Sequence, residues 1–164
     1  RDIKPENIFL TDSGQIRVLD FGLASESDTG MRLTQPGEPM GTPAFMSPEQ
    51  ARGRGEWVDA QSDLYSVGAT MYAALSGGEP PLAANQRVDR DDYVPARKAW
   101  GAKYSAELLD IVDWCLRLDH LERPQSVLAL QKTLRGEREP ERRADAPVLE
   151  QLRGAMLRLK GSFF

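Results

Sequence analysis

The sequence predicts an α+β fold that is mainly helical and carries one short β-hairpin near its start. Two β-rich runs, Ile8-Phe9-Leu10 and Ile16-Arg17-Val18-Leu19, flank the turn-forming residues Asp12-Ser13-Gly14. Later in the chain, apolar residues recur at helical spacing instead of alternating. The chain has 164 residues, 40% of them hydrophobic and 28% charged, which is typical of one globular domain with a real core.

The first helix is expected to begin at Ser47. A serine cap, Pro48 at the first helical position and Gln50 three residues after the cap form the pattern of a capping box. The glycines and arginines of residues 52–55 end this short helix.

Three longer helices follow. Residues 61–76 are apolar on most sides and predict a buried central helix, with Leu64, Val67, Met71 and Leu75 at helical spacing. A third helix is expected after Ser105, and a fourth from about Ser126 to Leu134.

Two segments depart from this regular pattern. Residues 22–41 have no period, and a loop of that length in a compact domain is usually functional or disordered. Residues 136–146 are mostly charged or helix-breaking, and predict a solvated linker. Beyond the linker, residues 147–164 predict an amphipathic helix, which either packs on its own domain or lies against a membrane surface or a partner.

Charge and cysteine usage exclude several classes of partner. The formal net charge is −4, so no domain-wide basic field exists to hold nucleic acid. The longest nearly uncharged stretch, residues 64–78, is too short and polar to span a membrane, and we expect membrane contact only through segments not present here. The single cysteine, Cys115, suits a reducing compartment, and a cytoplasmic location is expected.

Four polar residues surround the hairpin and carry the chemistry. A hairpin folds back on itself, so Asn7 at its entry and Asp20 at its exit should come close in space. An amide oxygen and a carboxylate are ligands suited to Mg²⁺. Asp2 and Lys4 would flank such a site as a base and as a cation that neutralises phosphate. Each of these residues alone would be read as a cap or a surface charge.

Five motifs in order resemble the protein kinase family, and most closely the eukaryotic-like Ser/Thr kinases of bacteria. They are the catalytic loop in residues 1–7, Asp20-Phe21-Gly22 as the metal-binding motif, residues 41–49 with Ser47 in place of the usual Ala of Ala-Pro-Glu, the helix motif of residues 63–68, and Arg123-Pro124. The resemblance covers residues 1–135 and begins inside the catalytic loop. It implies a mainly helical C-lobe, with the N-lobe and its Gly-rich nucleotide loop absent.

The resemblance implies a role for each site residue. Asp2 would accept or orient the proton of a substrate hydroxyl, and Lys4 would stabilise charge on the phosphoryl group of ATP. Asn7 and Asp20 would hold Mg²⁺, or Mn²⁺ in its place, against the ATP phosphates.

Further residues would act on structure and regulation. The resemblance implies that Thr42 braces the catalytic loop, that Asp63 anchors its backbone, and that Glu49 and Arg123 form a buried ion pair. In the loop of residues 22–41, Thr34 is expected to carry an activating phosphate that pairs with Arg1. His120, Cys115 and the tryptophans Trp57, Trp100 and Trp114 are interpreted as turn or packing residues.

The function implied by the resemblance is transfer of the ATP γ-phosphoryl group to Ser/Thr hydroxyls of proteins. The isolated fragment is expected to be inactive, because the N-lobe of the same protein supplies half of the nucleotide cleft. Two alternatives remain open from the residues. One is a pseudokinase or regulatory binding module, and the other is a small-molecule phosphotransferase.

Overall fold

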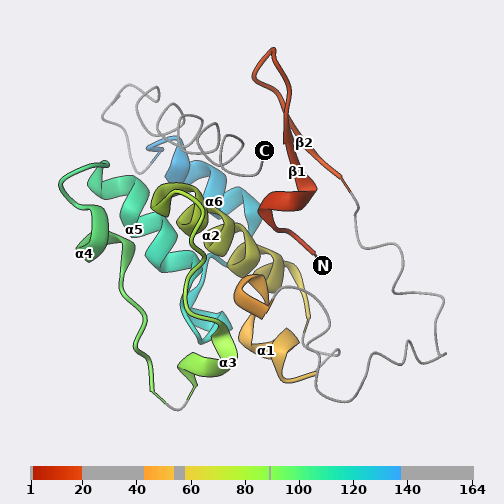
Figure 1. Ribbon diagram of the computed structural model, residues 1–164, viewed down its shortest axis with the longest axis vertical. Helices are drawn as coiled ribbons and strands as arrows, with labels where there is room; N and C mark the ends of the chain where they lie inside the picture. Colours follow the sequence, from red (N-terminus) through yellow and green to blue (C-terminus); the bar gives the residue numbers. More distant parts are fainter. Residues whose placement is uncertain (1, 20–42, 54–57, 89, 138–164) are drawn as a thin grey trace, which may run out of the picture.

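The computed structural model describes residues 2–19, 43–53, 58–88 and 90–137, and places a β-hairpin beside a group of helices (Figure 1). The elements in chain order are η1 (Pro5–Asn7), β1 (Ile8–Leu10), β2 (Ile16–Val18), η3 (Pro43–Phe45), α1 (Pro48–Ala51), α2 (Ala60–Ser76), α3 (Ala84–Arg87), α4 (Ala96–Trp100), α5 (Ala106–Cys115), η5 (His120–Glu122) and α6 (Val127–Leu134). The predicted fold class, mainly helical with one short hairpin, is confirmed.

In the hairpin, the start of β1 lies next to the end of β2. β1 and β2 pair antiparallel, with Ile8 opposite Val18 and Leu10 opposite Ile16. Gly14 closes the turn at a φ of 77°, a left-handed conformation that glycine adopts without steric cost. Beyond the strands, the backbone N–H of Leu19 donates to the carbonyl of Asn7 at 2.7 Å. The residues before β1 therefore lie against the end of β2.

The helices whose capping residue directly precedes them begin where the sequence predicts. The side chain of Ser47 accepts from the Gln50 N–H, and the Gln50 side chain accepts from the Ser47 N–H, which forms the expected capping box of α1. Ser105 and Ser126 cap α5 and α6 through the N–H groups three residues later.

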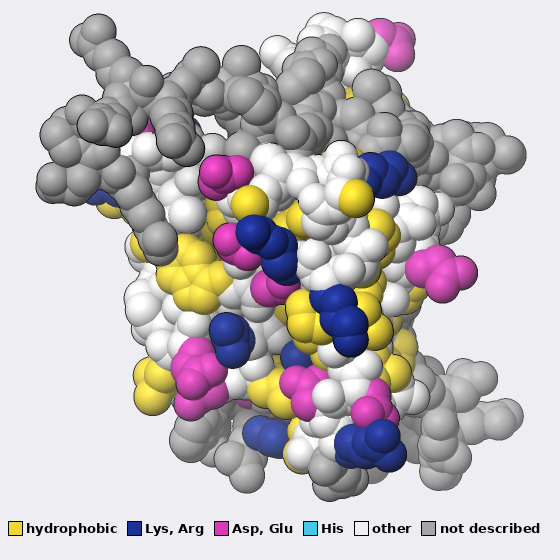
Figure 2. All heavy atoms as spheres, turned by 90° about the vertical axis from the view of Figure 1, so that its left-hand side faces the viewer, with side chains coloured by type: hydrophobic (Ala, Val, Ile, Leu, Met, Phe, Trp, Pro, Cys, Tyr) yellow, Lys and Arg dark blue, Asp and Glu magenta, His cyan; other side chains and the backbone are white. Residues whose placement is uncertain are grey.

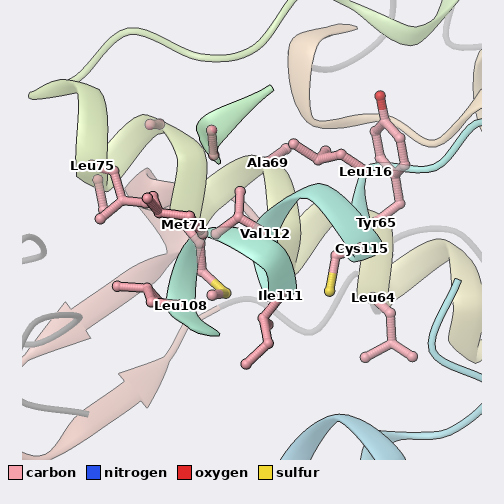
Figure 3. Close-up of a cluster of buried hydrophobic side chains, with 14 of the residues drawn as sticks. Leu64, Tyr65, Ala69, Met71, Leu75, Leu108, Ile111, Val112, Cys115 and Leu116 are labelled. Atoms are coloured by element: carbon pink, nitrogen blue, oxygen red, sulfur yellow. The ribbon is translucent and has the colours of Figure 1, made fainter. Parts of the chain in front are cut away.

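The core lies where α2 packs against α5 (Figure 3). Labelled side chains such as Leu64 and Tyr65 of α2 and Val112 and Cys115 of α5 are buried in one cluster. Gly68 permits this close approach, because a Cβ atom there would lie 2.5 Å from the Cβ of Cys115. Residues 60–76 are thus the buried central helix that the sequence predicts.

The short helices α3 and α4 were not predicted, because their supports come from distant residues. The Asp113 carboxylate of α5 accepts from the backbone N–H groups of Ala96, at 2.6 Å, and Arg97, at 3.1 Å, and so caps α4. It also accepts from the Tyr93 hydroxyl at 2.5 Å. Burial and this hydrogen bond raise the pKa of Tyr93.

On the face shown in Figure 2, Lys and Arg side chains alternate with Asp and Glu side chains, so this face carries no field of one sign. None of the helices in the described ranges has the length and apolar content to cross a membrane. The expected loop of residues 22–41 and the C-terminal helix of residues 147–164 lie outside the described residues, as does residue 138 onward of the expected linker.

Candidate active site

Three of the predicted site residues meet at one carboxylate. The turn η1 brings Asn7 back toward Lys4, whose carbonyl accepts from the Asn7 N–H at 3.0 Å. The Lys4 Nζ lies 2.8 Å from Asp2 Oδ2, and the Asn7 Nδ2 donates to the same oxygen at 3.1 Å. The Asp2 side chain is 42% exposed and that of Lys4 is 19% exposed. The carboxylate is therefore fixed from one side and open to a substrate.

The side chain of Asn7 is oriented so that it can serve a cation. Its Nδ2 donates to both the carbonyl and the carboxylate of Asp2, at 2.8 and 3.1 Å, which leaves Oδ1 as the atom that can bind a metal. Amide and carboxylate oxygens together suit Mg²⁺. Within the described ranges, no three His, Cys, Asp or Glu side chains gather into a metal site. The other expected ligand, Asp20, lies outside the described residues, so the metal site stays a prediction.

Six predicted site residues lie outside the described residues. They are Arg1, Asp20, Phe21, Gly22, Thr34 and Thr42. Their roles stay predictions.

The ion pair expected between Glu49 and Arg123 is present and buried. The guanidinium donates to both carboxylate oxygens, at 2.8 and 3.0 Å, and the Ser62 hydroxyl donates to Oε1 at 2.6 Å. Burial raises the pKa of Glu49, but the hydrogen bonds from Arg123 and Ser62 outweigh it and hold the pKa at about 2. The pair fastens α1 to the segment before α6.

The start of α2 lies beside these elements. Asp63 is half-buried in the first turn of α2, and its role toward the catalytic loop stays a prediction. One turn later, the Ser66 hydroxyl donates to the carbonyl of Phe45 at 2.8 Å. This bond ties η3, the segment that precedes α1, to the central helix.

A second buried arginine, Arg87, was not predicted. Its Nη1 donates to the Tyr65 hydroxyl at 3.2 Å and to the Leu116 carbonyl at 2.9 Å, and it forms an ion pair with Asp91. The Arg123 guanidinium lies 5.1 Å from the centroid of the Tyr65 ring, so Tyr65 contacts both buried arginines. The spacing of Arg87 and Asp91 by four residues was the only signal in the sequence.

Of the residues set aside in the sequence, Cys115 and Trp100 are packing residues and His120 is a turn residue. Cys115 is fully buried, and burial raises the pKa of its thiol to about 12, which makes it unreactive. Trp100 packs edge-on against Tyr72, with ring centroids 4.7 Å apart. His120 lies in the turn η5. Trp57 lies outside the described residues.

Residues 1–134 match the family model of the protein kinase domain. The chain belongs to the protein kinase family. All five motifs lie within the matched residues. Members of this family use ATP and a divalent metal ion.

The chain is similar to bacterial kinases. It is 45% identical to a probable serine/threonine-protein kinase of Streptomyces coelicolor over 103 residues, which are 58% of this chain and 15% of that protein. It is 44% identical to the serine/threonine-protein kinase PknB of Mycolicibacterium smegmatis over 105 residues, 60% of this chain and 16% of that protein. The matched region thus spans about a sixth of these relatives.

The fold is similar to that of a solved structure. The apo form of PpkA-294 superposes with a TM-score of 0.64 at 30% sequence identity, and the match covers 81% of this chain and 45% of that chain.

Proposed function

We propose that this chain supplies the catalytic C-lobe of a Ser/Thr protein kinase. The observation that carries the proposal is the cluster in which Lys4 and Asn7 both contact the carboxylate of Asp2. The bacterial relatives are named as serine/threonine-protein kinases, which supports a Ser or Thr hydroxyl of a protein as the acceptor.

Each side chain has a defined part in the proposed reaction. The exposed carboxylate of Asp2 takes the proton of the substrate hydroxyl as its oxygen bonds to the γ-phosphorus of ATP and ADP leaves. The ammonium of Lys4, next to that carboxylate, stabilises negative charge on the phosphoryl group. Mg²⁺, or Mn²⁺ in its place, would neutralise the ATP phosphates when bound by Asn7 and Asp20.

The ATP-binding lobe would come from another segment of the same protein. Beside the catalytic cluster, the hairpin exposes Phe9, Ile16, Val18 and Leu19. Exposed apolar side chains that gather on one small element are typical of a surface covered by another structure. We therefore propose that the 164-residue chain alone does not transfer phosphate. A cytoplasmic location fits the supply of ATP and the single reduced thiol of Cys115.

Regulation by the loop of residues 22–41 is also part of the proposal. A phosphate on Thr34 would add about −1.5 to −2 charge and acceptor oxygens with which Arg1 can pair. Pairing of this kind orders activation loops in kinases.

The test is made in the protein that carries both lobes. Asp2→Asn should abolish phosphate transfer from ATP to a generic protein substrate while ATP binding and the thermal midpoint stay unchanged. The matched control is Asp12→Asn in the exposed hairpin turn, which should keep full activity. Full activity of Asp2→Asn would refute the proposal. A wild-type protein that binds ATP without transferring phosphate would instead indicate a pseudokinase.

A further inference from the structure

The turn η3 is held on α2 by its backbone and by a side chain. The Ser66 hydroxyl donates to the Phe45 carbonyl at 2.8 Å, with a longer contact of 3.3 Å to the Ser62 carbonyl in its own helix. The Phe45 side chain is buried in the core cluster. The Met46 N–H donates to the Pro43 carbonyl at 3.2 Å, which closes the turn. The backbone of η3 therefore has a fixed place on the central helix.

Three buried hydroxyl groups on α2 differ in what they contact. The Ser62 hydroxyl donates to the Glu49 carboxylate of α1, and the Ser66 hydroxyl donates to η3. The Thr70 hydroxyl donates at 2.9 Å to the Ser66 carbonyl, a bond that stays within α2. Ser66 and Thr70 are 2% and 4% exposed, so both hydroxyl groups are shielded from water. Removing either one costs a buried hydrogen bond, but only the bond from Ser66 joins α2 to η3.

The place of η3 in the sequence connects this bond to the proposed reaction. η3 begins directly after Thr42, the residue expected to brace the catalytic loop. Phe45 is three residues after Thr42, so at most about 11 Å of extended chain separates them. A shift of η3 would therefore be passed on to Thr42. Because a misplacement of about 1 Å can lower the rate of an enzyme by about 100-fold, the position of η3 bears on phosphate transfer at Asp2.

We propose that Ser66 is a positioning residue for phosphate transfer. Through the Phe45 carbonyl, it fixes the point at which the loop of residues 22–41 rejoins the helical domain. Since Ser66 is 2% exposed, it acts through η3 and not on the substrate. This inference rests on the proposed function. One helix then serves two parts of the site, because Asp63, one turn before Ser66, is expected to anchor the catalytic loop.

Steady-state kinetics in the protein that carries both lobes test the proposal. Ser66→Ala should lower kcat by about tenfold or more and leave the KM for ATP within about twofold, because Ser66 does not act on the nucleotide. Alanine is a better helix former than serine, so α2 is retained in this variant. The matched control, Thr70→Val, removes a buried hydroxyl from the same helix and should keep kcat within about twofold. Ser66→Thr keeps the hydroxyl and should retain most of the wild-type kcat.

Hydrogen exchange separates the anchoring of η3 from a general loss of stability. Well below the thermal midpoint, the Met46 amide should exchange about tenfold faster in Ser66→Ala and at the wild-type rate in Thr70→Val. Unchanged exchange at Met46 or an unchanged kcat in Ser66→Ala would overturn the proposal. Losses of kcat as large in Thr70→Val or in Ser66→Thr would also overturn it.

Failure of the proposed function would give a different result. A wild-type protein that binds ATP would then transfer no phosphate, and the positioning role would fall with the proposed function. The faster exchange at Met46 in Ser66→Ala would persist, because the bond to Phe45 does not depend on catalysis.

Discussion

Glu49 and Arg123 are 74 residues apart in the sequence, yet two hydrogen bonds of 2.8 and 3.0 Å join their side chains in the interior. Arg123 also donates to the carbonyls of Arg117, Leu118 and Gln61. Because both charged groups are buried, either one would be left without its counter-ion if the other were removed. The Glu49–Arg123 pair therefore links α1 to the segment before α6, and we call this pair the clamp.

Removing one partner of this clamp should destabilise the fold strongly. Arg123→Met or Glu49→Gln is expected to lower the free energy of unfolding by about 3–5 kcal/mol, as for other buried ion pairs that lose one side. Urea denaturation followed by circular dichroism measures the loss. The control is Arg97→Met, which breaks an exposed ion pair with Asp110 and should cost less than about 1 kcal/mol. Equal losses in the two variants would contradict the clamp.

The clamp should also make stability depend on acid pH. The pKa of Glu49 is lowered from 4.5 to about 2 in the folded chain, so its contribution is present above pH 4.5 and is lost as the pH falls toward 2. The difference corresponds to about 3 kcal/mol. Unfolding free energies measured between about pH 5 and pH 2 should fall more steeply for the wild type than for Glu49→Gln. Parallel curves would show that another carboxylate dominates.

The sequence is informative where the cause of a structure is local. The caps Ser47, Ser105 and Ser126 stand next to the helices that they start, so those helices could be predicted. Likewise, Asp2, Lys4 and Asn7 lie close together in the sequence, with five residues from Asp2 to Asn7. The hairpin could be predicted from its turn residues.

Features supported from a distance could not be predicted in the same way. The cap of α4 comes from Asp113, 17 residues after Ala96, and no pattern in the sequence near Ala96 predicts it. Arg87 is buried through contacts with Leu116, 29 residues later, and with Tyr65, 22 residues earlier. The Glu49–Arg123 pair was expected only through the family resemblance, since spacing alone cannot pair two such distant charges.

The capping role of Asp113 can be tested directly. Asp113→Ala should expose the N–H groups of Ala96 and Arg97 and leave the Tyr93 hydroxyl without its acceptor, at a cost of about 1–3 kcal/mol. Hydrogen exchange at Ala96 and Arg97 should accelerate. The matched control is Asp110→Ala, one turn earlier in α5, which should leave these amides protected. Unchanged exchange in Asp113→Ala would show that α4 is held by packing alone.

If a phosphate on Thr34 pairs with Arg1, the losses of activity caused by replacing the two residues should not add. In the protein that carries both lobes, Thr34→Ala and Arg1→Ala should each lower the rate of phosphate transfer, because each removes one side of the same contact. The double variant should then be no slower than either single variant. Thr29→Ala, in the same loop, serves as the control. Additive losses, or a phosphate mapped to another residue, would place the activating site elsewhere.

The packing of α2 on α5 rests on the absence of a side chain at Gly68. A Cβ atom there would lie 2.5 Å from the Cβ of Cys115 and 3.3 Å from Cγ of Leu116, both in a close-packed interior. A Gly→Ala change in an exposed helix usually stabilises it by up to about 1 kcal/mol, whereas Gly68→Ala should destabilise the chain by about 1–3 kcal/mol. Urea denaturation measures the sign of the change.

Substitutions at Cys115 identify the cause of the loss of stability in Gly68→Ala. Cys115→Gly removes the Cβ atom that clashes, so Gly68→Ala should cost less in a Cys115→Gly background than in the wild type. Cys115→Ala removes the sulfur but keeps the Cβ atom, and the cost of Gly68→Ala should remain unchanged in that background. If Cys115→Ala relieved the cost as fully as Cys115→Gly, the clash would involve the thiol and not the Cβ atom. The contact between the backbones of α2 and α5 at Gly68 would then not be what limits their spacing.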